Sequence, residues 1–261
     1  QGAQAWHALT PGGLVEVGGT LSVANNTRFY CVSHPTNGVS ARIKTRNLAV
    51  RKGGRITADG QGFFGGLGSA YWSAATTLPG QSNWGYGPAG RWLNLSYSGG
   101  GGPNEYRAPG GSHGGRGARI TDARAVYDDE DMPHMAGAGG SGGDLGGFGG
   151  GVLYLEVARE ARIEGTLTAQ GVNKSGGHSS TGGGGAVYLA APRLFLGENA
   201  SIDAKGNNGA GSGGAGGGGR IAVYRLLDCD GSLDEATVLG TVMRVTGGTN
   251  GEITNYFAEP G

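Results

Sequence analysis

Carboxylates in the middle of the chain form its clearest candidate metal site. The acidic run consists of Asp128, Asp129, Glu130 and Asp131, and Asp144 follows in a Gly-Gly-Ser-Gly-Gly-Asp stretch. That stretch matches the start of a calcium-binding nonapeptide repeat, and carboxylate oxygens are the hard ligands that Ca²⁺ prefers. The match fails at Gly146, where the repeat needs an apolar residue. These five carboxylates are therefore a candidate calcium site, with a solvated acidic loop as the alternative.

His113 adds a second chemistry to the same region. Together with Arg116 and the acidic run it has the residue types of a polysaccharide lyase centre, and many such enzymes are parallel β-helices. That link is an analogy between folds and no local motif supports it. The five histidines also form no cluster with metal-ligand spacing. We expect no catalytic residue in this chain, and no cofactor other than calcium.

Aromatic residues gather between Phe63 and Tyr106, a segment that holds three of the four tryptophans. The candidate ligand or interface residues are Trp72, Trp84, Tyr86 and Trp92. Flat rings stack on sugars and anchor protein interfaces, and they also fill small cores under long loops. The sequence leaves these three interpretations open.

Two cysteines and four glycosylation sequons complete the candidate sites. A disulfide between Cys31 and Cys229 would close a very long loop, and the alternatives are two free thiols or bonds to neighbouring subunits. The Asn-x-Ser/Thr sequons are at Asn25, Asn94, Asn173 and Asn199. They mark outward turns if the host glycosylates, and are otherwise ordinary turn asparagines.

The charge balance excludes two classes of partner. The chain has 20 basic and 20 acidic residues and a pI of about 7.1. A nucleic-acid binder needs a basic face to neutralise phosphates. No apolar run approaches the roughly 18 residues of a membrane helix. We expect neither nucleic-acid binding nor membrane insertion.

Glycine blocks give the chain its regular pattern. Sixty of the 261 residues are glycine, and the blocks at 149–151, 182–185 and 216–219 each lead directly into a short alternating apolar segment. Leu153, Val187 and Ile221 occupy equivalent places 34 residues apart. A fixed period with the same alternation in each copy is typical of stacked repeats.

The pattern predicts an all-β fold, namely a right-handed parallel β-helix or closely related solenoid. The copy at 186–206 would supply three strands to one coil, and the glycine blocks would lie alongside as polyglycine-II-like segments or as disordered loops. We expect one elongated solenoid domain over residues 1–261. It would have initial coils at 1–60, a glycine- and aromatic-rich insert at 61–150, and regular repeats at 151–261.

Particular motifs in these repeats resemble those of a known group. The segment Gly-Ser-His-Gly-Gly at 111–115, followed by Gly-Gly-Gly-Arg-Ile-Ala-Val-Tyr at 217–224 and Gly-Gly-Thr-Asn-Gly at 247–251, is similar to glycine-rich β-helical repeats of bacterial surface and secreted proteins. The resemblance covers about residues 48–257. It implies an extracellular repetitive scaffold and supplies no catalytic residues.

These observations predict an extracellular structural protein that forms a surface fibre. Lightly charged strands at 14–23 and 252–257 would pair head-to-tail, because an open strand edge recruits another chain. The tail 1–9, with Trp6, would add a strand to the preceding subunit. The alternative is a carbohydrate-binding module or a polysaccharide-active enzyme of adhesin or lyase type, which would place surface glycans among the partners.

Overall fold

The computed structural model describes residues 12–66, 85–88, 110–118, 126–141, 146–173, 180–209, 213–226, 236–238 and 242–248. Within these ranges the secondary structure consists of β-strands, and no helix occurs. The strands are β1 (Leu14–Val23), β2 (Arg28–Tyr30), β3 (Arg42–Val50), β4 (Arg55–Thr57), β5 (Val152–Ile163), β6 (Thr166–Thr168), β7 (Ala186–Ala191), β8 (Arg193–Leu196), β9 (Ser201–Asp203), β10 (Arg220–Arg225), β11 (Ala236–Val238) and β12 (Val242–Arg244).

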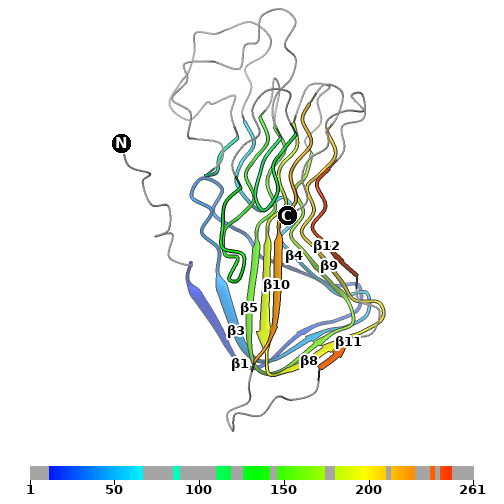
Figure 1. Ribbon diagram of the computed structural model, residues 1–261. Helices are drawn as coiled ribbons and strands as arrows, with labels where there is room; N and C mark the ends of the chain where they lie inside the picture. The colour runs from blue at the N-terminus through cyan, green and yellow to red at the C-terminus, as the bar shows by residue number, and fades with distance from the viewer. Residues whose placement is uncertain are drawn as a thin grey trace, which may run out of the picture.

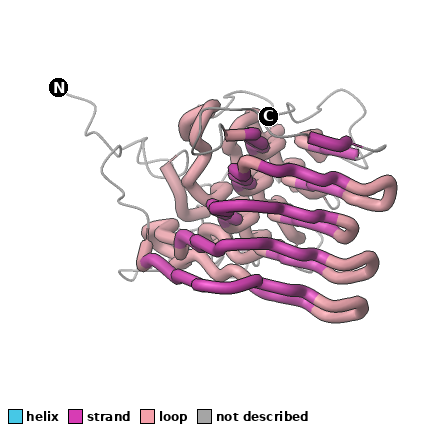
Figure 2. The backbone as a smooth tube through the Cα atoms, turned by 90° about the horizontal axis from the view of Figure 1, so that it is seen from below, coloured by secondary structure: helices cyan, strands magenta, loops and turns pink. Residues whose placement is uncertain are grey.

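All strand pairs between these elements are parallel, and they form two sheets (Figures 1 and 2). The larger sheet has the order β1-β3-β5-β7-β10, with β8 and β11 continuing beyond the end of β7 and β10. The smaller sheet has the order β12-β9-β6-β4-β2. Both sheets therefore follow the chain from one end to the other, so that each repeat lies beside the next.

The 34-residue spacing read from the sequence is the register of the larger sheet. Leu153 pairs with Val187, and Val187 pairs with Ile221. The same pairing links Leu155, Leu189 and Val223, which lie two residues further along each strand. A period of 34 residues therefore returns the chain to the same position in the neighbouring repeat.

Tight turns separate the strands of one repeat. Asn26, between β1 and β2, has φ 58°, and Gly53, between β3 and β4, has φ 78°. Both values lie in the left-handed region that Asn and Gly adopt most readily. These turns send the chain from the larger sheet to the smaller one.

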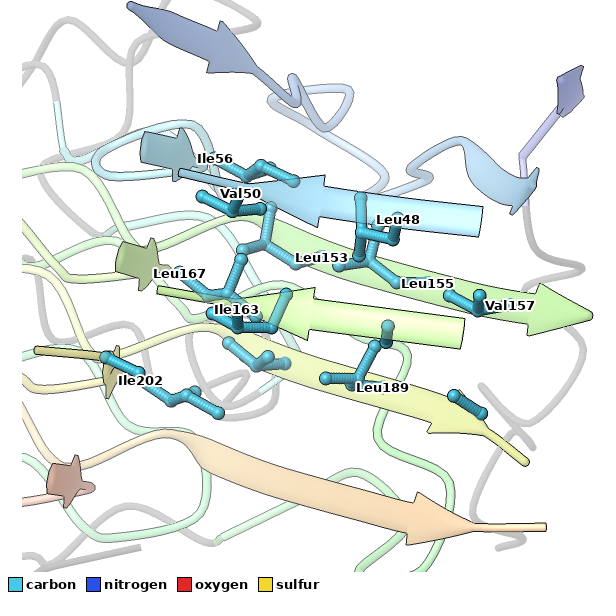
Figure 3. Close-up of a cluster of buried hydrophobic side chains, with 14 of the residues drawn as sticks. Leu48, Val50, Ile56, Leu153, Leu155, Val157, Ile163, Leu167, Leu189 and Ile202 are labelled. Atoms are coloured by element: carbon cyan, nitrogen blue, oxygen red, sulfur yellow. The ribbon is translucent and has the colours of Figure 1, made fainter. Parts of the chain in front are cut away.

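Apolar side chains fill the space between the two sheets (Figure 3). The core takes alternate residues from each strand, as the two-residue period of a β-strand requires. Its largest fully buried members are Leu48, Ile56, Leu153, Leu155, Ile163, Leu167, Leu189, Leu196 and Ile202. Each is in line with a similar side chain on the neighbouring strand, which gives continuous apolar rows across the repeats.

Glycine-rich segments lie side by side beyond the sheets and hydrogen-bond to one another (Figure 1). The N–H of Gly137 donates to the carbonyl of Gly150 (2.8 Å), and that of Gly150 donates to Gly183 (2.9 Å). The next link runs from Gly184 to Gly217 (2.9 Å). Because these backbones satisfy each other laterally, the described glycine blocks are packed structure rather than loose loops.

The predicted right-handed parallel β-helix, or related solenoid, is wrong. The strands form two parallel sheets, and the glycine-rich part of each repeat is not a strand. Of the three strands expected in the copy at 186–206, β7 and β8 belong to the same sheet. Glycine explains the difference, because a backbone without Cβ atoms can pack against neighbours on several sides instead of forming a third sheet.

Replacing Gly184 tests whether this close packing stabilises the protein. A Cβ built there would overlap the carbonyl oxygen of Ala204, which is backbone and cannot swing away. We expect Gly184→Ala to lower the free energy of unfolding by about 3 kcal/mol, the upper range for overpacking. Urea denaturation followed by circular dichroism measures the change.

Gly18 provides the matched control. A Cβ at this glycine of β1 meets no atom within 4 Å, so Gly18→Ala should change stability by less than about 0.5 kcal/mol. Equal stability of the two variants would contradict close glycine packing as a stabilising feature.

Candidate functional site

The most deeply buried ionisable pair is His113 with Asp128. Both side chains have 0% exposure, and Nε2 of His113 lies 3.0 Å from Oδ2 of Asp128. On the other side of the ring, Nδ1 lies 3.1 Å from the carbonyl oxygen of Gly185, at the start of β7. Each ring nitrogen therefore faces an oxygen atom that can accept a hydrogen bond.

Backbone amides complete the surroundings of the Asp128 carboxylate. Its oxygens accept hydrogen bonds from the N–H groups of Asp129 (2.9 Å), His134 (3.1 Å) and Met135 (3.1 Å). Burial raises the pKa of this carboxyl, but the hydrogen bond and charge of His113, with the amides, outweigh burial and hold the pKa below its usual value. The carboxylate thus organises the loop at 127–135.

This loop is attached to the edge strand β10. Arg220 Nε donates to the carbonyl of Tyr127 (3.2 Å), and Arg220 also lies 3.4 Å from a carboxylate oxygen of Glu130. The Tyr127 ring lies 4.9 Å from the His113 ring, and its hydroxyl donates to the carbonyl of Ala136 (2.7 Å). Burial, followed by the Asp128 charge, raises the pKa of Tyr127 well above its usual value.

These contacts define what the pair can do. A general acid or base has to come within hydrogen-bond reach of a substrate, and neither His113 nor Asp128 is exposed. The pair therefore positions the loop at 127–135 against β7 and β10. His113 itself is therefore not accessible for the lyase-type role considered for it, whereas Arg116 and the residues Asp129, Glu130 and Asp131 are exposed.

Two of the five predicted calcium ligands, Asp128 and Asp129, accept backbone hydrogen bonds, whereas Glu130 and Asp131 contact the side chains of Arg220 and Tyr224. Asp129 accepts the N–H groups of Asp131 (2.8 Å) and Met132 (2.9 Å), while the lone pairs of Asp128 go to the amides and His113. No group of three or more His, Cys, Asp or Glu side chains able to hold a metal occurs in the described part of the chain. Asp144 lies outside the described residues, so the calcium site stays a prediction.

A row of three tyrosines lies on the outer face of the larger sheet, and the sequence reasoning missed it. The rings of Tyr154 and Tyr188 stack with their centroids 4.4 Å apart, and Tyr224 follows at 5.8 Å. Arg42 continues the row, with its guanidinium 5.3 Å from the Tyr154 ring centre. Burial raises the pKa of both Tyr154 and Tyr188. The 34-residue spacing of these two tyrosines was the signal that could have found the row.

The aromatic insert is mostly beyond the described residues. Trp72, Trp84 and Trp92 lie outside them, and Tyr86 lies within. Tyr86 is half-buried against the aromatic cluster on the outer face of the larger sheet, and its N–H donates to the carbonyl of Phe64 (2.8 Å). Tyr86 thus packs on this cluster, and the ligand or interface roles expected for Tyr86 and the tryptophans stay predictions.

The structure describes some of the cysteine and sequon residues. Cys31 carries a free thiol whose pKa burial raises to about 12, and its suggested partner Cys229 lies outside the described residues. Asn25, Asn173 and Asn199 are exposed, as glycosylation requires. Asn94, like the tail 1–9 and the segment 252–257, lies outside the described residues.

The two ends of the sheets form the other candidate site. Among the described strands, β1 and β2 each pair on one side only, and so do β10, β11 and β12 at the opposite end. Ten large apolar side chains are exposed in the described residues, and seven of them are at these ends. They are Leu14, Val15, Tyr30 and Val32 at the first end and Leu226, Val242 and Met243 at the second.

Comparison with known proteins adds no relative to these observations. No family model, no curated protein and no solved structure matches the chain. The resemblance to bacterial glycine-rich surface repeats thus stays a prediction from the motifs. Within the described residues, no helix is long and apolar enough to cross a membrane.

Removing the Asp128 charge tests its organising role. Asp128→Asn removes the buried carboxylate that His113 and the backbone amides of the loop contact, and breaking a buried pair costs about 3–5 kcal/mol. We expect a loss of this size in the free energy of unfolding, measured by urea denaturation. Glu130→Gln is the control, because the Glu130 side chain is 83% exposed, and it should have an effect below about 0.5 kcal/mol. Similar losses in the two variants would contradict the role of Asp128.

The lowered pKa of Asp128 also predicts a pH dependence. A carboxyl whose pKa is lower in the folded state adds stability above its unfolded pKa of about 3.9, and this part is lost as the pH falls through the folded pKa. Free energies of unfolding measured from pH 6 downward should fall less steeply for Asp128→Asn than for the unmodified chain. The same pH dependence in the two proteins would refute the lowered pKa of Asp128.

Proposed function

We propose that the chain is an extracellular structural protein, a subunit of a surface fibre that assembles head-to-tail through the ends of its two sheets. The observation that carries this proposal is the concentration of exposed apolar side chains at the two ends. Val15 of β1 is 46% exposed, whereas Ile43, its partner on β3, is 3% exposed. A second copy placed on this edge would bury Val15 as the protein itself buries Ile43.

The long edge strand β1 lacks several of the devices that usually prevent pairing. Lysine, proline and short length commonly protect an exposed edge, but β1 has ten residues, no lysine and no proline. Its register shift between Val17 and Thr20 is not such a device, because the interior strand β3 has a shift at the same place, between Thr45 and Asn47. The edge strand is therefore built like an interior one.

The two ends differ from each other, which favours a polymer over a closed dimer. One end presents β1 and β2, and the other presents β10, β11 and β12. A contact between unlike surfaces is heterologous, and it generates a filament when its rotation does not close a ring. Repeated addition at these ends supports a fibre.

A lysine on the first edge tests the proposal. Val15→Lys places a charge where the next subunit would bury an apolar side chain, while the folded monomer keeps that position exposed. We expect the concentration needed for fibre formation to rise at least about tenfold, equivalent to 1.4 kcal/mol or more per contact. Sedimentation and electron microscopy measure the polymer.

Asn199→Lys is the matched control, because Asn199 is an exposed turn residue of an interior repeat. It should assemble at the concentration of the unmodified chain. The proposal fails if the unmodified chain stays monomeric at high concentration. It also fails if the two lysine substitutions raise the concentration needed for fibre formation equally.

A further inference from the structure

We infer, on the basis of the proposed function, that one subunit joins the next by parallel strand pairing in the register that already links the internal repeats. In this junction β10 and β11 of one copy lie beside the two halves of β1 in the next. The short strand β12 lies beside β2. The partner is therefore a second copy of this chain, held in one defined register.

The strand layout at the two ends supports this junction. β5 pairs β7 along its first half and β8 along its second half, and these strands in turn pair β10 and β11. β1 and β3 have the same two halves, separated by their register shifts. Each strand at the last edge thus has a counterpart at the first.

The apolar rows of the core stop at both ends with partly exposed members. One row runs Val15, Ile43, Leu155, Leu189 and Val223 through successive strands of the larger sheet. A row in the smaller sheet runs Phe29, Ile56, Leu167, Ile202 and Met243. Its three middle members, which Figure 3 shows, are fully buried, and Met243 is 47% exposed.

Continuing these rows brings compatible side chains together. Val223 meets Val15, and Met243 meets Phe29, a thioether against an aromatic ring. On the outer face of the larger sheet, the row Glu16, Lys44, Glu156, Ala190 and Tyr224 brings the Tyr224 ring beside Glu16, while the Tyr224 hydroxyl donates to Oδ1 of Asp131 (3.4 Å) in its own subunit. A slip of one residue would turn every apolar member to the opposite face, so the register is strongly specified.

Engineered cysteines test the register in the assembled protein. In a chain with Cys31→Ala and Cys229→Ala, the substitutions Glu16→Cys and Tyr224→Cys put two thiols on adjacent strands of the junction. Neighbouring strands are about 4.8 Å apart, within the Cα separation of a disulfide. We expect oxidised fibres to run as a ladder of covalent oligomers on a denaturing, non-reducing gel, and as monomer after reduction.

Glu16→Cys with Arg220→Cys is the matched control. Arg220 is on the same face of β10 but four residues away, about 13 Å along the strand, so no ladder should form. Leu14→Cys with Ala222→Cys places the two thiols on the neighbouring row of the same face. If the pair Glu16→Cys and Tyr224→Cys prevents assembly, this second in-register pair should give the ladder.

The outcomes separate the two proposals. A ladder from the in-register pairs alone supports the junction. Fibres that form without a ladder from either in-register pair, or with an equal ladder from the control, overturn the register and leave the fibre proposal standing. A parent chain that forms no fibres overturns both.

Discussion

The structure depends on one constraint, which is that backbone N–H and C=O groups must find partners on neighbouring backbones. In the two sheets, parallel strands provide those partners. In the glycine-rich segments they come from several directions at once, since the segment at 146–150 bonds to Phe63, Gly137 and Gly183. Any Cβ at these contacts would separate the backbones. The abundance of glycine is therefore a packing requirement of the fold.

The same constraint distinguishes the end repeats of the two sheets from the interior repeats. Interior repeats satisfy their backbone groups and apolar rows against neighbours on both sides. Within the described residues, the first and last repeats have a neighbour on one side only, and several of their apolar side chains remain exposed. The His113–Asp128 pair belongs to the interior pattern, because it fixes the loop at 127–135 against β7 and β10 without reaching solvent.

Sequence reasoning identified the parts that follow from local pattern. Alternation at 152–155, 186–189 and 220–223 located β5, β7 and β10, and the 34-residue spacing gave their register. The predicted architecture was wrong, because the apolar pattern does not indicate which strands share a sheet. Sequence reasoning also missed the Tyr154–Tyr188 stack and the pairing of His113 with Asp128, whose partners lie on different segments.

The sequence by itself thus determined the strands, their period and the places where glycine is required, because each is a property of residues close together in the chain. Tertiary structure decided that there are two parallel sheets, that the glycine segments bond laterally, and that Asp128 is a buried structural carboxylate rather than an open ligand. These features depend on contacts between segments up to about a hundred residues apart, such as Gly111 with Gly217. Which distant backbone satisfies a given N–H or carboxylate is set by the packing of the whole chain, and no local pattern encodes it.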